Sequence, residues 1–137
     1  MAFVMDNSST MAWLLSEPTL VDHASFGNRL RSEGVFVPGH WKLEVGNALL
    51  QGVRRKRIDE PDVMAFLTAL GALPIAIDEQ FLEHAWNATI SLAQRHTLTT
   101  YDAAYLELAV RLSLPLATLD GPLAKAAIAE GVEVIGG

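Results

Sequence analysis

Four acidic residues stand where strands and helices of this sequence are expected to meet. Asp6 follows the apolar run at residues 3–5, and Asp120 follows the apolar run "LPLATL". Asp102 opens an amphipathic segment, and Glu44 lies inside another. In a parallel sheet, the carboxyl ends of the strands share one edge with the N-termini of the helices that follow them. The three aspartates map to that edge independently, and Glu44 could reach it from the helix after the second strand.

Each acid also has a purely structural explanation. Asp6 and Asp120 precede expected helices, and aspartate is a favoured N-cap. Asp102 comes three residues after Thr99, which is the spacing of a capping box. Glu44 could simply be a solvated helix residue. Capping accounts for each acid singly, but it does not account for their convergence.

Convergence of the acids indicates a cation. Carboxylates that share a cleft repel one another unless some are protonated or a cation joins them. Oxygen-only ligand sets favour hard cations such as Mg²⁺ or Mn²⁺. The four histidines have no metal-ligand spacing, and the lack of cysteine excludes thiolate sites and thiol catalysis. The hydroxyls at residues 8–10 have no histidine at a motif spacing, so a nucleophilic serine is not expected.

Two polar residues stand close to the acids in the expected elements. Asn47 lies one turn after Glu44 in mid-helix, a position that asparagine does not favour, which suggests a role for its amide. Thr118 comes two residues before Asp120, so both side chains point to the same side of the strand.

Short apolar runs alternate with longer amphipathic segments along the chain. Strands are expected at residues 2–5, 35–38, 73–77, 114–119 and 132–135. Helices are expected from about residue 8 to 15, and at 19–33, 41–57, 60–70, 79–95, 99–112 and 121–131. This alternation predicts an α/β fold: a three-layer sandwich with a mostly parallel sheet of four to five short strands flanked by helices. No linker or repeat divides the chain, so residues 1–137 are expected to form one domain.

Composition limits the classes of partner. The formal charge of −6 argues against binding a polyanion, unless several acids serve a cation instead. In that case phosphates could be bound by the basic run of Arg54, Arg55, Lys56 and Arg57. Alternatively, the run interacts favourably with the negative end of the helix dipole and keeps the protein soluble. No signal peptide or membrane-spanning segment is expected, and the absence of cysteine suits a reducing, cytoplasmic compartment.

Together, four stretches resemble the PIN-domain ribonucleases, and within them the VapC-type toxins of bacterial toxin–antitoxin pairs. The stretches are "FVMDNSSTMAWLL", "WKLEVGNALL", "TTYDAAYLELA" and "LATLDGPLAKAA". In that family an acid follows the first strand, a glutamate sits in an E-x-x-N helix and two aspartates come late. Asn7 and Gly121-Pro122 depart from the usual family pattern.

The resemblance implies a Mg²⁺- or Mn²⁺-dependent endoribonuclease that acts as the toxin of such a pair. Its catalytic and metal-binding residues would be Asp6, Glu44, Asp102 and Asp120, with Asp120 holding a water or a second ion. Supporting polar residues would be Ser8, Asn47 and Thr118. The implied partners are an RNA substrate and a cognate antitoxin, in a homodimer that joins antitoxin chains in a hetero-oligomer.

Two other functions remain open at this point. A PIN-like module without catalytic activity would keep the fold for protein contacts, although the intact acids argue against it. An aspartate-nucleophile phosphoryl-transfer domain would use Asp6, but such enzymes carry a second aspartate two residues later, where this chain has Ser8.

Overall fold

Five short parallel strands form the centre of the molecule. The computed structural model describes residues 1–136. The strands are β1 (Phe3–Met5), β2 (Val35–Pro38), β3 (Ile75–Asp78), β4 (Leu116–Ala117) and β5 (Val134–Ile135). They lie in the order β3-β2-β1-β4-β5, and every neighbouring pair is parallel. The α/β sandwich with a parallel sheet, expected from the alternating pattern, is therefore confirmed.

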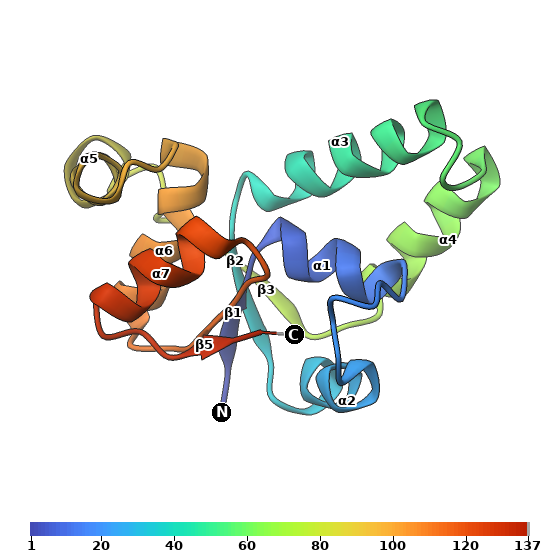
Figure 1. The fold of residues 1–137 in the computed structure, drawn as a ribbon, viewed down its shortest axis with the longest axis horizontal. Helices are drawn as coiled ribbons and strands as arrows, with labels where there is room; N and C mark the ends of the chain where they lie inside the picture. Colours follow the sequence, from blue (N-terminus) through green and yellow to red (C-terminus); the bar gives the residue numbers. More distant parts are fainter. Residues whose placement is uncertain (137) are drawn as a thin grey trace.

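Helices cover both faces of the sheet. They are α1 (Asn7–Leu14), α2 (His23–Ser32), α3 (Trp41–Arg54), α4 (Glu60–Gly71), the π-helical turn η1 (Ala85–Thr89), α5 (Ile90–His96), α6 (Thr100–Leu112) and α7 (Gly121–Ala129). Helices α1 to α4 lie on one face, and α5, α6 and α7 lie on the other (Figure 1). Right-handed crossovers produce this division, because the chain leaves β1 and β4 in opposite directions across the sheet.

The strand order creates a switch point between β1 and β4. The chain passes from β1 through α1 and α2 to β2, but from β4 through α7 to β5 on the other side. Ligands of parallel α/β sheets bind beyond the carboxyl ends of strands at such points. Met5 pairs with Ala117, so the next residue of each strand, Asp6 and Thr118, face each other at this edge.

The core holds the central strands and helix α6 in place. All residues of β1 are fully buried, and so are Leu106, Leu108 and Ala109 of α6. Burial of such side chains stabilises the fold by about 25 cal/mol per Å² of apolar surface. No helix within residues 1–136 is both long enough and apolar enough to cross a membrane.

Several elements are shorter than their patterns predict. Helix α2 begins at His23 instead of residue 19, because the Asp22 side chain accepts a hydrogen bond from the Ser25 amide and caps it there. Helix α3 ends at Arg54, and Lys56 then adopts a left-handed backbone (φ 59°) that stops the helix. The expected helix over residues 79–95 begins only at residue 85, as a π-helical turn. Ahead of it, the Phe81 ring stacks on His40, so a tertiary contact shapes this segment.

Candidate active site

Asp6 is a buried carboxylate surrounded by hydrogen-bond donors. Its side chain is only 4% exposed. Its Oδ1 accepts from the Ser9 amide at 2.9 Å, which confirms the expected N-cap of α1. Its Oδ2 accepts from Thr118 Oγ1 at 2.5 Å, and Ser8 Oγ lies within hydrogen-bonding distance of both oxygens. The capping role therefore uses only part of this carboxylate.

Burial and hydrogen bonding act on Asp6 in opposite directions. Burial raises the pKa of Asp6 above its usual range, because it disfavours the charged form. Hydrogen bonds from Thr118, Ser9 and Ser8 lower the pKa and offset part of that rise. The donors thus hold a carboxylate in a place that would otherwise exclude it.

Thr118 and Ser8 connect the acids that follow β1 and β4. Thr118 donates its single hydroxyl proton to Asp6 and accepts from the backbone amide of Asp120 at 3.0 Å. Ser8 accepts from the Leu119 amide at 2.9 Å. The side chain of Asp120 accepts from the Leu123 amide at 3.2 Å and caps α7, as its position predicts. One hydrogen-bond network therefore joins Asp6 to the backbone of Asp120.

Glu44 is held by an aromatic residue from the opposite helix layer. Tyr105 Oη donates to Glu44 Oε1 at 2.5 Å, and His40 Nε2 lies 3.4 Å from the same oxygen. Burial and Glu44 both raise the pKa of Tyr105, so its phenol remains a donor. The simple solvated role for Glu44 is wrong, because its carboxylate binds a side chain that is only 1% exposed. Asn47, one turn further along α3, is exposed.

Asp102 stands at the start of α6, where it feels the other three acids. Its backbone amide donates to Thr99 Oγ1 at 3.1 Å, which confirms Thr99 as the cap of this helix. Burial raises the pKa of Asp102, and the negative charges of Asp120, Glu44 and Asp6 raise it further. Asp102 therefore lies within range of the electric fields of the other three acids.

These four carboxylates do not yet form a coordination shell. Within residues 1–136, no three histidine, aspartate or glutamate side chains are arranged to hold one metal ion. The donor chemistry nevertheless fits a hard cation: all four groups offer oxygen, and none of them pairs with a lysine or arginine of the described chain.

The basic run lies at the far end of α3 from Glu44. Arg54, Arg55, Lys56 and Arg57 are all exposed. Ten residues separate Glu44 from Arg54, or about 15 Å along a helix at 1.5 Å per residue. Arg57 forms an ion pair with Glu17 at 3.2 Å. The run is thus outside the group of acids.

Residue patterns alone missed three side chains that shape this site. Ser9 donates to Asp6 through both its amide and its hydroxyl. Tyr105 and His40 contact Glu44, although the histidines have no metal-ligand spacing in the sequence. The hydroxyl-rich run after Asp6 was a usable signal for Ser9, whereas the contact with Tyr105 depends on how α6 crosses α3.

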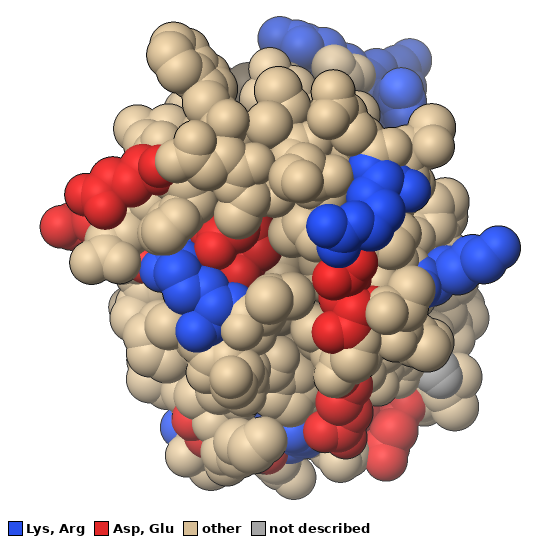
Figure 2. Space-filling view, turned by 90° about the vertical axis from the view of Figure 1, so that its left-hand side faces the viewer, with Lys and Arg blue, Asp and Glu red and all other residues tan. Residues whose placement is uncertain are grey.

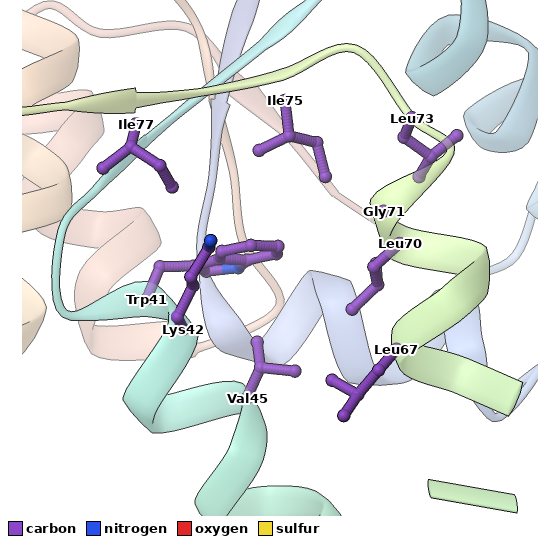
Figure 3. A pocket seen from close by; sticks show the side chains of 9 residues that line it. All are labelled: Trp41, Lys42, Val45, Leu67, Leu70, Gly71, Leu73, Ile75 and Ile77. Atoms are coloured by element: carbon purple, nitrogen blue, oxygen red, sulfur yellow. The ribbon is translucent and has the colours of Figure 1, made fainter. Parts of the chain in front are cut away.

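An apolar groove of about 400 Å³ lies away from the acids, between α3, α4 and strand β3. Figure 3 shows Trp41 and Val45 of α3 facing Ile75 and Ile77 of β3, with Leu70 of α4 at one end. None of the four candidate carboxylates lines it. Apart from Lys42, the side chains that line it are apolar, so the groove offers no carboxylate to bind a cation.

Comparison with known proteins identifies the family. No protein-family model matches the chain. Ribonuclease VapC12 of Mycobacterium tuberculosis is 32% identical over 124 residues, which span 89% of this chain and 89% of that protein. The chain belongs to the VapC family of ribonucleases. Ribonuclease VapC1 of the same organism is 39% identical over 89 residues, covering 61% of this chain and 60% of VapC1.

Solved structures share the fold. PAE2754 from Pyrobaculum aerophilum superposes with a TM-score of 0.71 at 22% identity, covering 98% of this chain and 89% of that one. FitAcB from Neisseria gonorrhoeae superposes with a TM-score of 0.57 at 17% identity, covering 98% and 96%. At these identities the likeness concerns the fold alone. It agrees with the PIN-like architecture that the sequence resemblance implies.

Proposed function

We propose that this protein is a metal-dependent endoribonuclease and the toxin of a toxin–antitoxin pair, formed by one domain over residues 1–137. The observation that carries the proposal is that the charges of Asp120, Glu44 and Asp6 all act on Asp102, while no lysine or arginine within residues 1–136 pairs with any of the four. Membership in a family of ribonucleases supports the choice of RNA as substrate.

The four acids would hold Mg²⁺ or Mn²⁺ at the carboxyl edge of β1 and β4. Asp6, Glu44 and Asp102 are the proposed direct ligands, and Asp120 would hold a water or a second ion. A divalent cation bound there would activate water and neutralise charge on the RNA phosphodiester. The basic run from Arg54 to Arg57 is proposed to bind the RNA backbone beyond the acids.

Neighbouring side chains would keep these ligands in place. Thr118 and Ser8 orient the Asp6 carboxylate, and Tyr105 orients Glu44. Hydrogen bonds of this kind hold metal ligands in the required orientation in other proteins. Asn47 is the proposed polar neighbour one turn along α3, where its exposed amide is free to meet substrate.

A cognate antitoxin would control the enzyme in the cytoplasm. A cleft of carboxylates suits an arginine guanidinium, whose planar fork pairs with two carboxylate oxygens. An arginine on the antitoxin would therefore occupy the place of the cation. Apolar residues of the antitoxin would cover the surface near Trp13 and α2, where Val21 is 79% exposed. Two copies of the nuclease would form a homodimer that carries two antitoxin chains.

Cleavage of single-stranded RNA by the purified protein tests the proposal. Cleavage should require Mg²⁺ or Mn²⁺ and stop with EDTA. Asp6→Asn removes one charge while keeping an N-cap side chain, so the variant should fold but lose cleavage. Full activity of Asp6→Asn would overturn the metal site. A catalytically inactive wild-type chain would favour a pure binding module, and harmless expression of an active chain without any co-purifying antitoxin would overturn the toxin role.

A further inference from the structure

The structure contains a buried hydrogen-bond bridge between α1 and α3, outside the carboxylates themselves. Trp41 Nε1 donates to Thr10 Oγ1 at 3.0 Å, and Thr10 Oγ1 donates to the backbone oxygen of Asp6 at 2.7 Å. Thr10 is fully buried and Trp41 is 4% exposed. Trp41 also walls the apolar groove (Figure 3).

The direction of this bridge is determined by its donors. The indole N–H of tryptophan is a donor only, so the Thr10 hydroxyl must accept from it. The hydroxyl has one proton, and that proton then goes to the Asp6 carbonyl, four residues earlier in the chain. The indole N–H therefore only donates, the Thr10 hydroxyl accepts from it and donates onward, and the Asp6 carbonyl accepts.

The bridge joins the two elements that carry Asp6 and Glu44. Asp6 caps α1, four residues before Thr10. Glu44 lies three residues after Trp41, one turn further along α3. The hydrogen bond between Trp41 and Thr10 thus fixes the position of the first turn of α3 relative to the first turn of α1. It thereby ties together the two helices next to which these carboxylates lie.

We propose that Trp41 and Thr10 are positioning residues, which fix α1 and α3 relative to each other so that Asp6 and Glu44 can converge on one divalent cation. This inference rests on the proposed metal site. It assigns the threonine at position 10 a role beyond packing. Loss of the bridge should leave the carboxylates present but spaced less accurately, so the cation should bind more weakly.

Binding of Mn²⁺ by the folded protein tests the bridge. Thr10→Val keeps the shape of the side chain but removes the hydroxyl, and Trp41→Phe removes the indole donor. Each change should weaken Mn²⁺ binding by up to about tenfold, the lower end of the losses seen when partners of metal ligands are removed. Thr10→Ser keeps the hydroxyl and should retain wild-type affinity. The double variant should bind Mn²⁺ as Thr10→Val does, because Thr10→Val already removes both hydrogen bonds of the bridge.

Thr89→Val is the matched control. Thr89 is 2% exposed, and its hydroxyl has no hydrogen-bond partner within residues 1–136. Its replacement removes a buried hydroxyl without touching the bridge, so Mn²⁺ affinity should not change.

Titration by calorimetry or by the paramagnetic resonance signal of free Mn²⁺, well below the melting temperature, separates the outcomes. If Thr10→Val or Trp41→Phe loses stability but binds Mn²⁺ as the wild type does, the bridge is only structural and the proposal is wrong. If Thr10→Val does not fold, Trp41→Phe and Thr10→Ser decide in the same way. If the wild type binds no Mn²⁺, or binds it only as well as Asp6→Asn does, the proposed metal site is wrong. That result is distinct from a failure of the bridge, which leaves Mn²⁺ binding by the wild type intact.

Discussion

Asp102 shows how one residue can oppose folding while serving a site. Its carboxylate is partly buried, and it faces the charges of Asp120, Glu44 and Asp6. The carboxylates of Asp6 and Asp120 accept helix-capping hydrogen bonds, which stabilise them where they lie. At Asp102, hydrogen bonding of the Thr99 side chain to the carboxyl lowers the pKa, but burial and repulsion raise it more. The metal-free protein should therefore be less stable because of this charge.

Asp102→Asn should stabilise the metal-free protein near pH 7. The raised pKa of Asp102 means that the folded state holds the proton more tightly than the unfolded chain does. Wild-type stability therefore falls as the pH rises from the unfolded value of 3.8 through the raised value in the fold. The variant does not titrate there, so its advantage should be small below pH 3.8, then grow and level off.

Melting temperatures in EDTA between pH 3 and pH 8 check this prediction. The gain should be at most about 4 °C, the shift that 1 kcal/mol produces in a domain of this size. Saturating Mg²⁺ should remove or reverse the advantage, because the wild-type carboxylate would then be paired. A variant less stable than the wild type at pH 7 in EDTA would contradict the repulsion.

Among the secondary-structure elements, helix α6 is joined to the edge of the sheet by ion pairs of Arg111. Arg111 of α6 makes two hydrogen bonds to Glu107 at 2.9 Å, and its Nη2 lies 2.6 Å from Asp78 at the end of β3. Both carboxylates raise the pKa of Arg111, so its charge is retained throughout the accessible pH range. Glu107 is only 3% exposed. These ion pairs therefore hold the helix that carries Asp102 and Tyr105.

Arg111→Met should destabilise the protein by about 3–5 kcal/mol, because it leaves the buried Glu107 without a counter-charge. Arg95→Met is the matched control, since Arg95 is 56% exposed where it pairs with Glu130. That change should cost no more than about 1 kcal/mol. Urea unfolding of both variants measures the difference. Equal destabilisation of the two variants would show that burial of Glu107 does not matter.

Elements with a strong period and a cap could be predicted from the sequence. The pattern over residues 99–112 predicted α6 with Thr99 as its cap, and the structure has both. The turn before η1 could not be predicted, because Phe81 stacks on His40, which is distant in the chain. The same limit applies to the site. The positions of the acids followed from strand ends, whereas the contact of Tyr105 with Glu44 depends on helix packing that no local pattern encodes.

For the whole molecule, the distribution of charge matters more than its sum. The net charge is −6, yet four of the sixteen acids are proposed to serve a cation. Figure 2 shows acidic and basic side chains interspersed over the face that carries α5, α6 and α7, without a continuous basic surface. Electrostatic attraction of RNA to that face should be weak. The run from Arg54 to Arg57, at the end of α3 on the other side of the sheet, is the denser group of positive charge.

Neutralising Arg54 and Arg55 together should weaken RNA binding and flatten its dependence on salt. For every phosphate that the variant no longer neutralises, the slope of log K against log salt should fall by about 0.7, the value for single strands. Binding is measured in the Asp6→Asn background, so that the RNA stays intact, at several NaCl concentrations. Arg95→Gln is the control, because Arg95 lies on the α5 face and is paired with Glu130, so its replacement should leave the slope unchanged. An unchanged slope after Arg54 and Arg55 are neutralised would assign these residues to solubility and to the dipole of α3 instead.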